Sequence, residues 1–78
     1  RVYIAVIHYM GTEAGDDIVR ALGRIKYAVK SKTMRGENNE MAVEVFCKDP
    51  SMEFADRIRA VKGVQDVTLI QYNGEYHG

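Results

Sequence analysis

The chain has 78 residues, and its eleven basic side chains equal its eleven acidic ones, so it carries no net charge at pH 7. This length excludes a multidomain enzyme and leaves room for one small domain. The hydrophobic share of 46% and the charged share of 28% are ordinary for a globular protein and exclude intrinsic disorder. Because a domain this small buries only roughly 60% of the surface of its unfolded chain, we expect it to associate with another chain or domain.

The cysteine content and the apolar runs limit the cellular location and the kinds of site that the chain can have. The one cysteine, Cys47, excludes an internal disulfide and a zinc site built from several thiolates of one chain, and it fits a cytosolic location. No apolar run approaches the roughly 18 residues of a membrane span. The sequence begins at Arg1, without Met and directly in a strand-like run, so we expect it to be a piece of a longer protein.

The first two predicted elements are a central strand and a helix. Residues 2–9 are apolar at both parities and rich in β-branched and aromatic side chains, as in a strand covered on both faces. Glycines between residues 10 and 15 predict a loop, and Asp16 and Asp17 then favour the positive end of a helix. Gly23 indicates either a close contact of this helix or its end. The apolar stripe of the helix is Ile18, Leu22 and Ile25.

The middle of the chain predicts a hairpin. Residues 27–35 alternate with period two, and Lys30 and Lys32 are typical of an edge strand, where charge discourages aggregation. Residues 36–39 have turn chemistry. The following strand, 41–48, alternates clearly. We expect its helix-facing set to be Met41, Val43, Val45 and Cys47, and its outward set to be Ala42, Glu44, Phe46 and Lys48.

The last elements are a second helix and a fourth strand. Asp49 is the expected N-cap, Pro50 the first helical residue and Gly63 the C-cap. Strand 64–72 follows, and 73–78 is expected to be a flexible C-terminal tail outside a single domain of residues 1–72. The apolar stripe of the helix is Phe54, Ile58 and Val61. In the strand, Val67 and Leu69 are expected to face the helices, and Thr68, Ile70 and Tyr72 to face outward.

The resulting order is βαββαβ, which predicts the α+β, ferredoxin-like fold: a four-stranded antiparallel sheet with two helices on one face. The first and third strands are then central. Because two helices cover one face only, the other should carry Phe46, Ile70 and Tyr72 together with one parity of the first strand, either Val2, Ile4 and Val6 or Tyr3, Ala5 and Ile7. Such a contiguous apolar patch predicts a protein contact. The alternative is scattered exposure, or cover by the tail.

Chemical motifs are largely missing from the sequence. Other classes with this topology would need a C-x-x-C loop for a heavy metal, an Arg in the first loop for acylphosphatase activity, or a K/R-G-F-x-F-like run on the third strand for RNA, and the sequence has none of these. We therefore expect no enzyme activity, metal, cofactor or nucleic acid. A third hypothesis, a hydrolase or metal protein, would require His8 and Cys47 to meet carboxylates.

The first loop is the one candidate ligand site. Glycines there leave backbone N–H groups accessible at a helix start, so we predict that Gly11, Thr12, Gly15 and Asp16 bind a small metabolite. The alternative role for Asp16 and Asp17 is to stabilise the helix by charge.

The element order, Gly15 at the first helix and the closing run Ile58-Arg-Ala-Val-Lys-Gly-Val-Gln-Asp-Val-Thr-Leu-Ile70 resemble ACT-type regulatory domains. The segments Val29-Lys-Ser-Lys-Thr33 and Val67-Thr-Leu-Ile-Gln-Tyr-Asn-Gly-Glu75 are similar to the C-terminal cytoplasmic ends of a family of bacterial multi-pass membrane proteins of unknown function. This resemblance implies a regulatory module on the cytoplasmic side of a bacterial inner membrane protein, held to the membrane only through a missing N-terminal region.

Two functions follow as hypotheses. The first is a non-catalytic regulatory or interaction module that forms a homodimer or higher oligomer through its sheet, by edge strands or by open faces. The second is a sensor of an amino-acid-like metabolite that binds at the loop from Met10 to Asp17.

Overall fold

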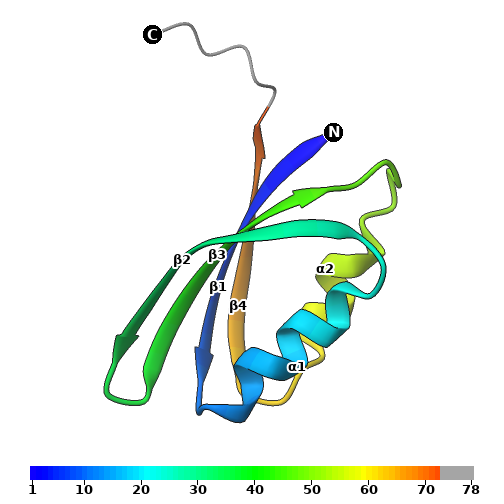
Figure 1. The fold of residues 1–78 in the computed structure, drawn as a ribbon. Helices are drawn as coiled ribbons and strands as arrows, with labels where there is room; N and C mark the ends of the chain where they lie inside the picture. Colours follow the sequence, from blue (N-terminus) through cyan, green and yellow to red (C-terminus); the bar gives the residue numbers. More distant parts are fainter. Residues whose placement is uncertain (73–78) are drawn as a thin grey trace, which may run out of the picture.

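The computed structural model of the protein describes residues 1–72 (Figure 1). In chain order the elements are β1 (Val2–Met10), α1 (Glu13–Leu22), β2 (Lys26–Arg35), β3 (Asn38–Phe46), α2 (Glu53–Arg59) and β4 (Val64–Tyr72). The predicted βαββαβ order and ferredoxin-like class are therefore confirmed. The tail predicted at 73–78 lies outside the described residues. Neither helix is long and apolar enough to cross a membrane.

The sheet is antiparallel throughout, with the order β2-β3-β1-β4, so β1 and β3 are central as predicted. Between β2 and β3 the register shifts after Val29, and Lys30 is the extra residue of the bulge. This bulge breaks the simple alternation expected for 27–35, because a single inserted residue moves all later side chains to the opposite face.

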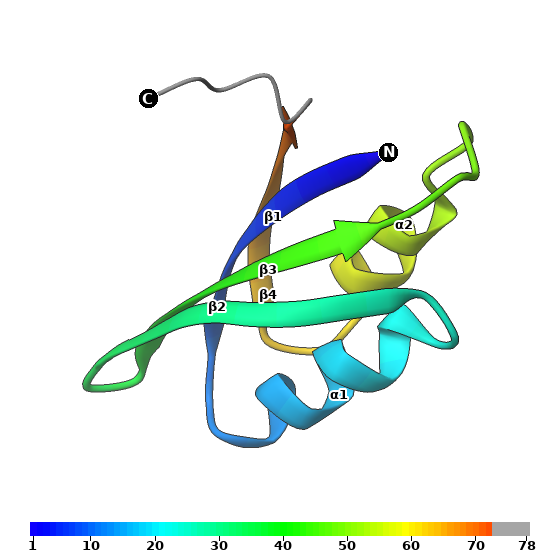
Figure 2. The ribbon, with the colours of Figure 1, turned by 45° about the horizontal axis from the view of Figure 1, so that its top comes forward.

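The core lies between the sheet and the two helices, which cover the same face (Figures 1 and 2). β1 directs Tyr3, Ala5, Ile7 and Tyr9 toward the helices, so Val2, Ile4 and Val6 face outward, which settles the parity that the sequence left open. The residues of β3 that were predicted to face the helices are buried, and so is Cys47, which directly follows the strand. From the helices, the buried residues are Ala14, Gly15, Ile18, Leu22, Phe54 and Ile58.

The second helix begins later than predicted. Its first residue is Glu53 and its N-cap is Met52, so the expected cap at Asp49 is wrong. Asp49 instead makes a turn of its own: its Oδ1 accepts a hydrogen bond from the Ser51 N–H at 2.9 Å, and its carbonyl accepts one from the Met52 N–H at 3.3 Å. An aspartate side chain that bonds the backbone two residues on competes with helix formation in this way.

Two glycines also differ from their predicted roles. Gly63 is not the C-cap of α2, which ends at Arg59 with Ala60 as its cap. It lies in the turn before β4, where its carbonyl accepts a 2.8 Å hydrogen bond from the N–H of Met10. Gly15 lies inside α1, which begins at Glu13. Gly23 marks the end of α1, one of its two predicted roles.

The helices leave most of strand β2 uncovered. In both ribbon views most of the β2–β3 hairpin lies to one side of α1 and α2 (Figures 1 and 2), and its turn contacts the loop before α1, where the N–H of Gly11 donates to the carbonyl of Glu37 at 3.4 Å. The register with Val45, Val43 and Asn39 places Tyr27, Val29 and Met34 on the helix side of the sheet. All three are nevertheless exposed, Met34 by 64%. We call these three residues the inner strip.

Candidate functional site

The face of the sheet turned away from the helices, which we call the open face, carries the predicted apolar patch. Neighbouring residues in the register form rows across β3, β1 and β4, and three rows are mainly apolar. Phe46 is 38% exposed and Ile70 is 51% exposed. In strand order the rows are Phe46 and Val2, then Glu44, Ile4 and Ile70, then Ala42, Val6 and Thr68. Each large apolar side chain here would contribute roughly 1.5–3 kcal/mol if a partner buried it.

Charged side chains flank the apolar rows of the open face at both ends, and Arg35, which pairs with Asn38, lies at the same end as Glu40. At one end, Lys26 lies over the ring of Phe46, with its Nζ 5.3 Å from the ring centre. Lys30 approaches Glu44 at 4.0 Å and leaves this carboxylate with a partner within the patch. At the other end, the row formed by Glu40, His8 and Asp66 is polar throughout.

His8 is held between two carboxylates at that end. Its Nδ1 lies 2.7 Å from Oδ1 of Asp66, and its Nε2 lies 3.2 Å from Oε1 of Glu40. The hydrogen bond with Asp66 is the main cause that raises the pKa of His8, and the charges of both carboxylates act in the same direction against partial desolvation. When His8 is protonated, both ring nitrogens donate and the row carries one net negative charge.

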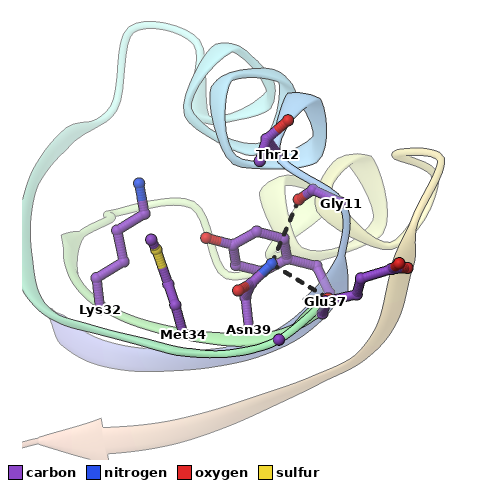
Figure 3. Close-up of a pocket in the computed structure, with 8 residues that line it drawn as sticks. Gly11, Thr12, Lys32, Met34, Glu37 and Asn39 are labelled. Atoms are coloured by element: carbon purple, nitrogen blue, oxygen red, sulfur yellow. Dashed lines mark hydrogen bonds between the residues drawn. The ribbon is translucent and has the colours of Figure 1, made fainter.

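A pocket lies where the β2–β3 hairpin meets the start of α1, and we call it the α1 pocket (Figure 3). Its volume is about 190 Å³, below the roughly 300–1,000 Å³ of sites for drug-sized ligands. Asn39 closes its floor, because its Nδ2 donates to the carbonyls of Gly11 at 3.3 Å and of Glu37 at 3.4 Å. The lining residues are Tyr9, Gly11, Thr12, Lys32, Met34, Gly36, Glu37 and Asn39.

Three polar groups of the α1 pocket are available to a ligand. Tyr9 is 2% exposed, yet within residues 1–72 its hydroxyl makes no hydrogen bond and is not sealed off from solvent. Burial raises the pKa of this phenol, which therefore stays protonated and can donate. The Thr12 side chain is the N-cap of α1 but makes no capping hydrogen bond. Lys32 extends along the pocket from β2 in the direction of Thr12 (Figure 3).

Only two of the four ligand residues predicted in the first loop line the α1 pocket. Gly11 and Thr12 line the α1 pocket, whereas Gly15 and Asp16 do not. Gly15 is buried against Tyr9, and Asp16 is exposed in the first turn of α1, where its charge suits the helix dipole. The sequence analysis missed Tyr9, Lys32 and Asn39. No signal in one sequence gives the register that brings these strands to the loop.

Two of the three predicted interface residues, Phe46 and Ile70, lie on the open face. Phe46 and Ile70 are exposed there. The backbone of Tyr72 pairs with Val2, and the side chain of Tyr72 is outside the described part of the structure.

A metal centre at His8 and Cys47 does not form in residues 1–72. Cys47 is buried beside the start of β1, where its N–H donates to the carbonyl of Arg1, whereas His8 lies at the far end of the same strand and on the opposite face. Within those residues no group of three or more histidine, cysteine or carboxylate side chains is arranged so that it could hold a metal ion.

No protein-family model matches the sequence, and no curated protein matches it. Among solved structures, the chain is similar to the ACT domain from GTP pyrophosphokinase of Chlorobium tepidum. Its crystal structure gives a TM-score of 0.70 at 14% identity over 88% of this chain and 96% of that one. The solution NMR structure of the same domain gives 0.69 at 13% identity over 100% and 94%.

A homoserine dehydrogenase from Thiobacillus denitrificans also contains this fold. It matches with a TM-score of 0.66 and 15% identity over 88% of this chain, which corresponds to 16% of that much longer chain. At these identities the likeness concerns the fold. The chain therefore has the fold of an ACT domain, as the sequence resemblance predicted.

Proposed function

We propose that this domain is a non-catalytic regulatory module that self-associates through the open face of its sheet. The observation that carries the proposal is the contiguous apolar patch around Phe46, Ile4 and Ile70 on a face that neither helix covers. Patches of this kind mark protein contacts. The presence of the same fold as a small part of a homoserine dehydrogenase chain supports a module that works beside a larger protein.

The distribution of charge favours a second copy as the partner. Basic Lys26 and Lys30 lie toward one end of the open face, and acidic Glu40 and Asp66 lie toward the other, where Arg35 occupies the β2 border. A two-fold axis perpendicular to the strands brings opposite ends together when two such faces pack. The apolar rows then meet in the middle, and the end with Lys26 and Lys30 meets the second copy's end with Glu40 and Asp66. The apolar contact and these opposite charges favour a second copy of the same face.

Light scattering coupled to size-exclusion chromatography tests this association. The natural chain is expected to be a dimer, and Ile70→Glu or Phe46→Glu is expected to give a monomer, because each buries a charge in an apolar contact. Met34→Glu is the matched control: it also places a charge on an exposed apolar residue, but on the other side of the sheet. A monomeric natural chain at high micromolar concentration would contradict the proposal, as would equal loss in the control.

The α1 pocket supports a second candidate function, the sensing of a small metabolite that carries a carboxylate. The ammonium of Lys32 would attract the carboxylate, and the hydroxyls of Tyr9 and Thr12 would donate to it. The small volume favours a ligand the size of an amino acid. The specific observation behind this candidate is the Tyr9 hydroxyl, which has no hydrogen-bond partner among residues 1–72 and belongs to an otherwise buried side chain.

Thermal unfolding with a panel of free amino acids and short carboxylic acids tests the pocket. A ligand at 100 times its Kd should stabilise the fold by about 2.7 kcal/mol. Tyr9→Phe and Lys32→Met should each reduce this shift, whereas Lys62→Met, which removes a charge outside the α1 pocket, should not. If no compound of the panel shifts unfolding, the sensor function is lost and the association proposal stands unaffected.

We further propose that the domain belongs to the cytoplasmic side of a bacterial inner membrane protein. The support is the similarity of Val29–Thr33 and Val67–Glu75 to the cytoplasmic ends of such proteins. The coding sequence before Arg1 is expected to specify several apolar helices. Cell fractionation should place the whole protein in the inner membrane, with this domain cut only by protease added from the cytoplasmic side. A whole protein found in the soluble fraction would contradict this setting.

A further inference from the structure

The outer edge of β2 is a free strand edge of unusual charge. The sheet order places β2 at one border, so the backbone groups on its outer side have no strand partner within residues 1–72. β2 spans ten residues, Lys26–Arg35, long enough to pair with a complete additional strand. Nearly all of it is exposed, and neither helix packs extensively against it.

The side chains of this edge are basic. β2 contains Lys26, Lys30, Lys32 and Arg35 and no acidic residue, in a chain whose net charge is zero. The opposite border of the sheet differs, because β4 has one charged residue, Asp66, and no basic one. The two edges would therefore attract different partners.

The helix side of β2 adds an apolar contact. Tyr27, Val29 and Met34 of the inner strip are exposed on that side, where Lys32 of the α1 pocket also lies. A strand added outside β2 would place every second side chain against the inner strip. Its alternate side chains would lie on the open face, beside Lys30 and Arg35.

We propose that β2 binds an extended acidic segment of another protein, in which acidic and apolar residues alternate, as an additional strand of the sheet. Backbone hydrogen bonds supply the affinity in this mode, and the side chains on the two faces supply the specificity. A second copy of the chain is a poor occupant, because β2 against β2 opposes basic residues to basic residues, and like charges opposite each other destabilise strand pairs. The lysines that hinder self-pairing thus favour an acidic strand.

The probe is a synthetic octapeptide of alternating glutamate and valine, with a lysine–valine octapeptide as the charge control. Titration into the ¹⁵N-labelled chain should shift amide signals of residues 26–35, and raising the salt concentration should weaken binding. The lysine–valine peptide should not bind. Absence of shifts in β2, or shifts centred on β4 or the open face, would overturn the proposal.

N-methylation separates strand addition from simple charge attraction. In a strand, the N–H groups of alternate residues point to opposite edges. One peptide is therefore methylated on every glutamate nitrogen and a second on every valine nitrogen, with identical charge. Strand addition requires that one of them binds and the other does not. Equal binding of both, or of neither, would overturn the proposed mode.

Charge reversal locates the contact. Lys30→Glu combined with Arg35→Glu should weaken the glutamate–valine peptide about tenfold or more, because both attractions become repulsions. The control combines Lys48→Glu with Lys62→Glu, which changes the net charge by the same amount at positions outside β2. This control should weaken binding of the glutamate–valine peptide far less. The same measurement on the Ile70→Glu variant should give unchanged binding, so failure of the association proposal and failure of this one are distinguishable.

Discussion

At the scale of single residues, His8 is the most unusual group of the chain. It joins two carboxylates that come from different strands, with Glu40 on β3 and Asp66 on β4. Both neighbours favour the imidazolium form, and together they raise its pKa. Its protonation is therefore linked to the folded state.

The linkage predicts that stability falls as the pH rises. His8 binds its proton more tightly in the folded chain than in the unfolded chain, so this stabilisation is fully present below the ordinary histidine pKa of 6.5 and is lost as the pH passes the higher folded value. Thermal unfolding in the Ile70→Glu background should show this decrease, and NMR titration should give the folded pKa directly. His8→Gln should remove this decrease of stability with pH, whereas His77→Gln should leave it unchanged. An identical pH profile for His8→Gln would refute the linkage.

Single-residue properties that depend on alternation could be predicted from the sequence. The exposure of Phe46 and Ile70 followed from the period of their strands, because alternate side chains face opposite sides. The pairing of His8 could not be predicted. Its partners lie 32 and 58 residues away, and only the register brings them together.

At the scale of elements, the turn between α2 and β4 is closely packed against the end of β1. Gly63 has φ +99°, and a Cβ at this position would lie 2.7 Å from the carbonyl oxygen of Met10 and 3.2 Å from Cβ of Ala14. Both the backbone conformation and the space thus require glycine.

Gly63→Ala is expected to destabilise the fold strongly. Positive φ for a residue with a Cβ costs roughly 1–3 kcal/mol, and displacement of the Met10 carbonyl adds to this cost. Gly36→Ala is the matched control, since Gly36 has φ +62° but nothing within 4 Å of the added Cβ. Urea unfolding should therefore show a larger loss for Gly63→Ala. A smaller or equal loss would show that the turn relaxes freely.

Element types were predictable, and several boundaries were not. Apolar periodicity and alternation identified all six elements, and five of them supply residues to the core or its partly buried border, whereas β2 is exposed along nearly its whole length. The start of α2 was misplaced because Asp49 bonds Ser51 instead of capping the helix. The bulge at Lys30 was missed because an extra residue in an exposed strand leaves no mark in the hydrophobic pattern.

At the scale of the whole molecule, the topology followed from the element order, whereas the α1 pocket did not. Two helices in a βαββαβ order cover one face only, so the open face was predictable with its outward residues. The pocket depends on how far the hairpin reaches past α1, and Lys32 enters it because the bulge reverses the parity of β2. A long-range geometric effect of one residue cannot be read from local patterns.

The proposed two-fold packing predicts a charge exchange. Lys26→Glu should weaken dimerisation, because it opposes acid to acid, and Glu40→Lys should weaken it as well. The double variant should recover part of the loss, since each new lysine then faces a new glutamate. Sedimentation equilibrium at low salt measures the dimerisation constants of the natural chain, the two single variants and the double variant. Simple addition of the two losses would reject this orientation of the faces.

The pairing of Val2 with Tyr72 also has a consequence for whatever protein the domain is joined to. Val2 and Tyr72 lie at one end of the sheet, and Tyr9 and Gly11 of the α1 pocket lie at the other end of β1. β1 alone separates the two by about 30 Å at roughly 3.4 Å per residue. A larger domain joined before Arg1 can therefore lie at that end of the sheet and leave the α1 pocket accessible to a ligand.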